Sequence, residues 1–202
     1  MKRVMVSQRV LAAEGRGETW DCLDQALSVF MAKVGLLCIA LPNTLSAVDL
    51  ATWMDTVEPA GLVLSGGGDV YRDPDRNRTE DKALEYAQDR RIPVLGICRG
   101  MQKLGVLGGT PLVEVKGHVA VRHGLKGDFE GDVNSFHAFS LANCPADYSV
   151  ELRAADGVIE SIRHKERPWL GLMWHPEREL PYRQADIDLV KQLFNSSVGP
   201  TT

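Results

Sequence analysis

The chain has 202 residues, of which 44% are hydrophobic and 25% are charged, close to the average for a soluble globular domain. This length suits one ordinary domain and leaves no room within the chain for a two-domain synthetase. The net charge of −4 gives no general attraction to nucleic acid, and the longest strongly apolar run is too short to span a bilayer. The first residues do not resemble a secretory signal, so we expect a cytoplasmic protein with neither nucleic acid nor a membrane as partner.

The first half of the chain alternates short apolar runs with amphipathic segments. The apolar runs predict strands, and residues spaced three and four apart predict helices. Such alternation predicts an α/β fold, a doubly wound and mostly parallel sheet flanked by helices. We expect strands at residues 3–7, 36–41, 61–64 and 93–97, and helices at residues 19–33, 46–57, 79–90 and 99–107.

The pattern changes at Thr110 to short segments separated by glycines. Segments 132–136, 149–154, 158–163 and 169–173 predict antiparallel or mixed pairing, and thus a small antiparallel extension, and residues 184–194 predict a final helix. Without repeats or linkers, we expect a single domain over residues 1–195 and a disordered tail over residues 196–202.

The four cysteines form no CxxC pair and no cluster with histidine, so the sequence suggests neither disulfides nor a metal site. Cys98 differs from the others because it lies between a predicted buried strand and a predicted helix, in the pattern Gly96-Ile97-Cys98-Arg99-Gly100. A strand, a Gly-x-nucleophile-x-Gly turn and a helix form a nucleophile elbow, in which the glycines make room for a tight turn. Cys98 is therefore the candidate nucleophile.

A cysteine nucleophile needs an imidazole base, and the base needs an orienting carboxylate. Residues two apart in an extended chain lie on the same face, so Glu177 can reach the ring of His175. The segment Ser65-Gly66-Gly67-Gly68 follows another predicted strand, and its bare N–H groups suit an oxyanion hole, with Gly67 and Arg99 as the expected donors. No Gly-Lys-Ser/Thr follows, which argues against a nucleotide P-loop.

The segments GICRGMQ, LSGGGD and GLMWHPER together resemble the class I glutamine amidotransferase superfamily and its flavodoxin-like fold. Within it, the chain resembles the free-standing γ-glutamyl hydrolases, such as the γ-glutamyl-GABA hydrolases. The resemblance implies a Cys98–His175–Glu177 triad, a γ-glutamyl thioester on Cys98 and no metal or redox cofactor. It further implies an oxyanion hole from Gly66, Gly67 and Arg99, and substrate contacts from Gln102, Asn134, Ser135 and His137.

Other segments, among them VSQRV and KGHVAVRH, resemble the short γ-glutamyl-CDP-amidate hydrolases of capsule phosphoramidate synthesis. This resemblance implies a substrate with a nucleotide-linked amine half. Arginine suits diphosphate geometry, so basic side chains gathered in an anion pocket would bind such a substrate. Solvated loop charges are an equally good interpretation of the same residues. The residues in question are Arg9, Arg72, Lys116, His118, Arg122 and His123.

Three other functions stay open at this point. The chain would be the glutaminase subunit of an amidotransferase if it delivered ammonia to a separate synthetase partner. It would be a cysteine peptidase if it cleaved α-peptide bonds, and a binding module if Cys98 were unreactive. The sequence also leaves open whether the protein is a homodimer.

Overall fold

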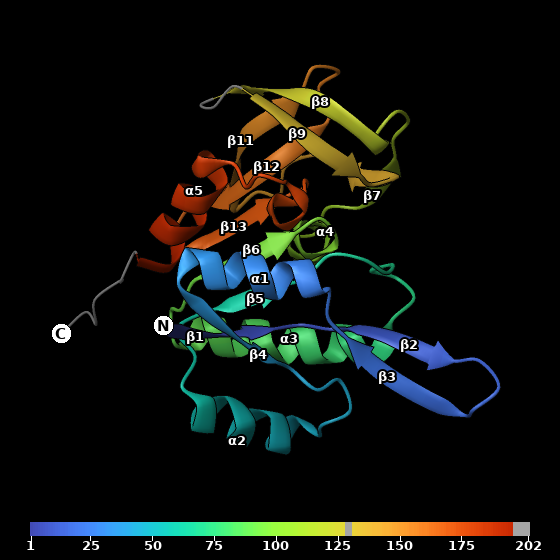
Figure 1. The fold of residues 1–202 in the computed structure, drawn as a ribbon, viewed down its shortest axis with the longest axis vertical. Coiled ribbons are helices and arrows are strands. Elements are labelled where there is room, and N and C mark those ends of the chain that lie inside the picture. The colour runs from blue at the N-terminus through green and yellow to red at the C-terminus, as the bar shows by residue number, and fades with distance from the viewer. Residues whose placement is uncertain (128–130, 196–202) are drawn as a thin grey trace.

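The computed structural model describes residues 1–127 and 131–195, so the expected tail at residues 196–202 lies outside the described residues. Its core is one nine-stranded sheet (Figure 1). The first five strands of this sheet are parallel, and the last four run antiparallel to their neighbours, as the predicted α/β fold requires. The strand order is β4 (Leu36–Ala40), β1 (Lys2–Val6), β5 (Leu62–Leu64), β6 (Val94–Ile97), β13 (Trp169–Leu172), β12 (Ile159–His164), β11 (Tyr148–Ala154), β8 (Val119–Gly127) and β9 (Gly131–Phe136).

Helices cover both faces of the parallel half of the sheet. Successive strand residues point to opposite faces, so Val4 and Val6 pack in one apolar core while Met5 packs in the other. The first core includes α1 (Gln25–Val34) and α5 (Gln184–Asn195), which lie together in Figure 1. The second core includes α2 (Ala47–Val57), α3 (Pro74–Asp89) and α4 (Arg99–Leu107). No helix within residues 1–127 and 131–195 has the length and apolar character needed to cross a membrane.

The predicted helix at residues 19–33 is wrong at its start. Glu18–Cys22 form strand β3, which pairs with β2 (Arg9–Ala13) in a hairpin that extends beyond the main sheet (Figure 1). Helix α1 begins only at Gln25, because Asp24 accepts a hydrogen bond from the N–H of Ala26 and caps the helix there.

Two further differences concern the start of one helix and a strand that was not predicted. Helix α3 begins at Pro74, five residues before the predicted start, and proline suits the first turn of a helix. Strand β8 was not predicted, because most of its side chains are exposed or half-buried. The remaining elements are two short strands, β7 (Leu112–Glu114) and β10 (Phe139–Leu141), and the short helix η1 (Pro176–Arg178).

The sheet topology brings the three sequence motifs to one edge. Strand β6 lies between β5 and β13, and all three are parallel. The segment expected at residues 169–173 in the antiparallel or mixed extension thus belongs to the parallel half and pairs antiparallel only with β12. The carboxyl ends of β5, β6 and β13 therefore meet, and open α/β sheets bind ligands at such an edge. Backbone pairing alone therefore places three features side by side: the glycine loop after β5, Cys98 after β6 and His175 shortly after β13.

Candidate active site

Cys98 sits on a strained turn between β6 and α4. Its φ of 51° and ψ of −102° lie outside the ordinary regions for a residue with a side chain. A Cβ atom on Gly96 would lie 2.6 Å from the carbonyl carbon of Gly100, and one on Gly100 would clash with the carbonyl oxygen of Leu64. Both glycines are thus required for the helix to pack closely on the strands while Cys98 projects from the turn.

His175 lies next to Cys98 and is held by Glu177. Its Nδ1 lies 2.6 Å from Oε1 of Glu177, and because a carboxylate only accepts, Nδ1 carries the shared proton. Burial lowers the pKa of His175, but hydrogen bonds with Cys98 and Glu177 and the charge of Glu177 outweigh burial and raise the pKa to about 9. The imidazole is therefore protonated at neutral pH, and its Nε2 is free to face the sulfur.

The antiparallel half of the sheet fixes the position of His175. Asn134, on β9, accepts a hydrogen bond from the N–H of His175 at 2.9 Å and donates one to its carbonyl at 2.8 Å. The ring of Phe136 packs edge-on against the imidazole, with the ring centres 5.9 Å apart. The imidazole of His175 is consequently held through its backbone, its Nδ1 and its ring.

The glycine loop after β5 lies against both side chains. A Cβ atom on Gly66 would be 2.6 Å from Cε1 of His175 and 3.6 Å from Cβ of Cys98, so only glycine fits there. The carbonyl of Gly66 accepts from Nε of Arg9 at 3.0 Å, and that of Gly67 accepts from Nη1 of Arg76 at 2.6 Å. In a planar trans peptide the carbonyl and the next N–H point in opposite directions, so the N–H groups of Gly67 and Gly68 face away from the guanidinium groups.

A buried ion network lies beneath this loop. Glu80 is fully buried between the guanidinium groups of Arg76 and Arg99, at 2.9 Å and 2.7 Å. Burial raises the pKa of Glu80, but the two positive charges outweigh it and hold the pKa below its ordinary value. Arg76 also donates to the carbonyl of Ser65 at 2.5 Å. The network therefore fixes the glycine loop and the start of α4 relative to each other.

A cavity of about 330 Å³ opens beside the sulfur of Cys98. Gln102 donates to the carbonyl of Phe139 at 2.9 Å, and within the described residues its Oε1 has no hydrogen-bond partner. This oxygen can accept from a ligand. The cavity is lined by Gly67, Gly68, Asp69, Tyr71, Cys98, Arg99, Gln102, Leu112, Phe136, His137, Ala138 and Phe139.

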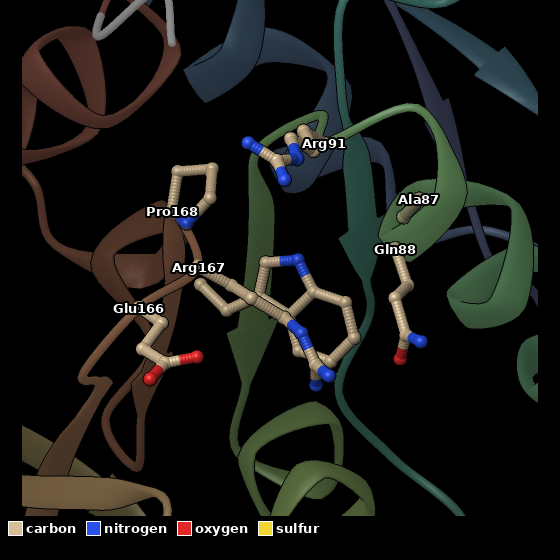
Figure 2. Close-up of a pocket in the computed structure, with 7 residues that line it drawn as sticks. Ala87, Gln88, Arg91, Glu166, Arg167 and Pro168 are labelled. Carbon is tan, nitrogen blue, oxygen red and sulfur yellow. The ribbon is translucent and has the colours of Figure 1, made fainter. Parts of the chain in front are cut away.

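A second cavity, of about 400 Å³, lies away from these groups. It is next to the first residue of β13, Trp169, with Arg167 stacked on the indole at 5.0 Å. Figure 2 shows Arg91 and Arg167 from different segments at its rim, with Glu166 and Gln88. Cys98 follows the last residue of β6, at the opposite end of the parallel strands, so this cavity does not serve the Cys98 site.

Comparison with known proteins identifies the family. Residues 20–192 match the model for glutamine amidotransferase class-I. The chain belongs to the class I glutamine amidotransferase family. It is 29% identical over 197 residues to the γ-glutamyl-CDP-amidate hydrolase of Campylobacter jejuni subsp. jejuni, and the alignment covers 94% of this chain and 96% of that protein.

Other members of the family are also similar. The chain is 34% identical over 146 residues to one subunit of the glutamine-hydrolysing GMP synthase of Methanococcoides burtonii, over 67% of this chain and 71% of that protein. A crystal structure described as that of a putative GMP synthase subunit from Thermoplasma acidophilum has a TM-score of 0.73 at 20% identity, over 96% of this chain and 93% of that one. That likeness supports the fold.

For this amidotransferase-family chain, the structure brings together Cys98, His175 and Glu177, and places Gly66, Gly67 and Arg99 beside them. Gln102 and His137 line the same cavity. Asn134 instead holds the backbone of His175, and Ser135 donates to the carbonyl of His118 at 2.7 Å. These two side chains are engaged within the protein.

The predicted anion pocket is dispersed. Arg9 lies at the glycine loop, and Arg122 binds both carboxylate oxygens of Glu179 at 2.9 Å and 3.0 Å. The exposed Arg72 pairs with Asp69. Of the other three predicted residues, Lys116 is exposed, and His118 and His123 face Glu160. None of the six basic residues lines the Cys98 cavity.

Sequence reasoning missed the residues that support the site from below. Glu80 lies on the helix predicted at residues 79–90, but Arg76 precedes its predicted start, and oppositely charged residues four apart on a helix are ordinarily solvent-exposed. The only available signal was that Arg76, Thr79, Glu80 and Ala83 share one helix face, which becomes informative only when that face is known to be buried.

Proposed function

We propose that the protein is a cysteine-dependent hydrolase that cleaves a γ-glutamyl amide and releases glutamate and an amine. The observation that carries the proposal is the position of Cys98 on a strained elbow next to an imidazole whose pKa is raised to about 9. A protonated imidazole beside a thiol supports the thiolate–imidazolium pair that nucleophilic cysteine catalysis uses.

The proposed reaction has two steps. The Cys98 sulfur attacks the γ-carbonyl carbon, N–H groups of Gly67 and Arg99 stabilise the oxyanion, and His175 gives its Nε2 proton to the nitrogen of the leaving amine. The carbon–nitrogen bond breaks and a γ-glutamyl thioester forms. Water then attacks the thioester and gives a proton to His175, so glutamate leaves and the Cys98 thiolate is restored.

The cavity supports a small γ-glutamyl group. It holds the free Oε1 of Gln102, which can accept from the α-ammonium group of the glutamyl half. For the amine half, similarity to the γ-glutamyl-CDP-amidate hydrolase of Campylobacter jejuni makes γ-glutamyl-CDP-amidate the first substrate to test. A glutaminase that serves a separate synthetase is the second candidate, favoured by similarity to the GMP synthase of Methanococcoides burtonii.

Glutamate release from γ-glutamyl-CDP-amidate, γ-glutamyl-GABA and glutamine tests both candidates. We expect kcat/KM to be highest for one γ-glutamyl conjugate and turnover to be abolished by Cys98→Ser. The exposed Ser149→Ala is a matched control that should keep full activity. Glutamine as the sole substrate, with a rate that rises on addition of a synthetase, would favour the glutaminase. Unchanged turnover in Cys98→Ser would refute the mechanism.

A further inference from the structure

Three of the five histidines converge on one buried carboxylate in the antiparallel half of the sheet. Glu160 lies on β12, His123 on β8, His118 just before β8 and His137 just after β9. Oε1 of Glu160 lies 3.2 Å from Nε2 of His137 and 3.4 Å from a ring nitrogen of each of the other two. A single oxygen is thus faced by three imidazole nitrogens, more than its lone pairs can serve well as hydrogen-bond acceptors.

The contacts around two of these rings limit where their protons can reside. Nδ1 of His137 lies 3.2 Å from the carbonyl oxygen of Phe139, and Nε2 of His118 lies 2.9 Å from Oδ2 of Asp156. Carbonyl and carboxylate oxygens only accept, so Nε2 of His118 carries a proton, whereas His137 has an acceptor 3.2 Å away on each side, the carbonyl of Phe139 and Oε1 of Glu160. In the neutral ring of His118, Nδ1 therefore directs a lone pair at Oε1 of Glu160, and a neutral His137 can donate to only one of its two acceptors.

Such an arrangement is unfavourable unless a cation lies between the groups. Nδ1 of His118, both ring nitrogens of His123 and Oε2 of Glu160 are buried atoms without hydrogen-bond partners in the described chain. Histidines that bind metals commonly donate their other N–H to a carboxylate or carbonyl, as His118 does here and as Nδ1 of His137 is placed to do. The cluster therefore has the outer contacts of a metal site as well as the inner ligands.

The three distances from Glu160 match those expected around a tetrahedral ion. With zinc bonds of about 2.0–2.15 Å, neighbouring ligand atoms in a tetrahedron are about 3.3–3.5 Å apart. The three distances from Glu160 are 3.2–3.4 Å, and all four ligand atoms lie within 4.8 Å of one another. The widest pair of ligand atoms would have to close by up to about 1.4 Å. The ring of His123 is the most exposed of the three, and neither of its nitrogens has a hydrogen bond that would oppose a rotation.

We propose that His118, His123, His137 and Glu160 bind one divalent transition-metal ion, with Zn²⁺ as the ion that best matches three imidazoles and a carboxylate. The site has four protein ligands, which is typical of structural rather than catalytic zinc. It joins three strands of the antiparallel half behind the segment 136–139, which forms one wall of the Cys98 cavity. The ion would hold that wall in place.

Metal binding by the full-length protein tests the proposal without reference to activity. After removal of metal with a chelator, the chain is titrated with Co²⁺, whose visible absorption is strong in tetrahedral sites, and the Co²⁺ is then displaced with Zn²⁺. The titration is repeated in Cys98→Ser, so that the reactive thiol cannot supply the signal. We expect one ion per chain in both proteins.

Variants separate a metal site from a structural cluster. Asp156 is about half exposed and touches His118 from outside, so Asp156→Ala should fold and weaken Zn²⁺ binding 10- to 100-fold. His123→Gln should lose the tetrahedral Co²⁺ spectrum. His164→Gln is the control: His164 is buried on the same strand as Glu160 but accepts hydrogen bonds from backbone N–H groups, so its loss should leave metal binding unchanged. Absence of tetrahedral Co²⁺ in the wild type, or an unchanged affinity in Asp156→Ala, would overturn the proposal.

Discussion

Replacement of Glu80 by glutamine tests whether the buried ion network holds the fold together. Glu80 is fully buried and accepts three hydrogen bonds of 2.7–2.9 Å from Arg76 and Arg99, which are themselves 0% and 1% exposed. The substitution keeps the shape but leaves two buried guanidinium charges without their counter-ion. Removal of one partner from a buried ion pair typically lowers the free energy of unfolding by about 3–5 kcal/mol. In a chain of this size that corresponds to a fall in Tm of about 6–20 °C.

Chemical denaturation of wild type, Glu80→Gln and Glu85→Gln measures the difference. Glu85 lies on the same helix and pairs with Lys82 in solvent, so its substitution should change the free energy of unfolding by less than about 1 kcal/mol. The pKa of Glu80 is lowered in the folded state. The advantage of wild type should therefore be present above about pH 4.3 and diminish as the pH falls through the folded-state pKa. Equal unfolding free energies for the two variants at pH 7 would refute the reasoning.

Two further predictions concern the site itself. Because His175 has a pKa of about 9, kcat/KM should fall as pH rises through that value. Glu177→Gln removes a charge that raises the pKa of His175, so the alkaline limb of the pH profile should move to lower pH. An unmoved limb would show that Glu177 does not act on the imidazole. Gly100→Ala forces a Cβ atom against the carbonyl of Leu64 and should lower the free energy of unfolding by about 1–3 kcal/mol. Gly124→Ala, which would meet only a carboxylate oxygen at 3.5 Å, is its control, and similar losses in the two variants would contradict the packing argument.

Sequence predicted the elements that are buried on both sides. The strands at residues 62–64, 94–97 and 169–172 are apolar runs interrupted only by glycine, and their motifs follow directly after them or within a few residues. The first two were expected in the parallel sheet, but the parallel pairing of the third with β6 was not. The β2–β3 hairpin escaped prediction for the opposite reason. Most of its side chains are exposed or half-buried, and Thr19–Cys22 fit the start of a helical pattern as well as they fit a strand.

Polar groups that are buried together could not be predicted from the sequence either. Glu160 looks like an ordinary charged residue in a strand, and nothing in its neighbourhood along the chain indicates that three histidines surround it. The histidines lie 23 to 42 residues away in sequence, and only the antiparallel pairing of β8 with β9 and of β11 with β8 and β12 brings them near Glu160. Local patterns carry no information about such pairing.

The backbone conformation of Cys98 sets stability against chemistry at a single position. A residue held at φ 51° and ψ −102° stores strain of about 1–3 kcal/mol, which glycine would largely release. Glycine also gives the unfolded chain more conformational freedom, which lowers stability by about 0.4–1 kcal/mol, less than the strain released. The free energy of unfolding of Cys98→Gly should therefore exceed that of Cys98→Ala, and both variants lack the thiol. Among variants that lack the thiol, directed evolution for heat tolerance alone should therefore enrich glycine over alanine at position 98.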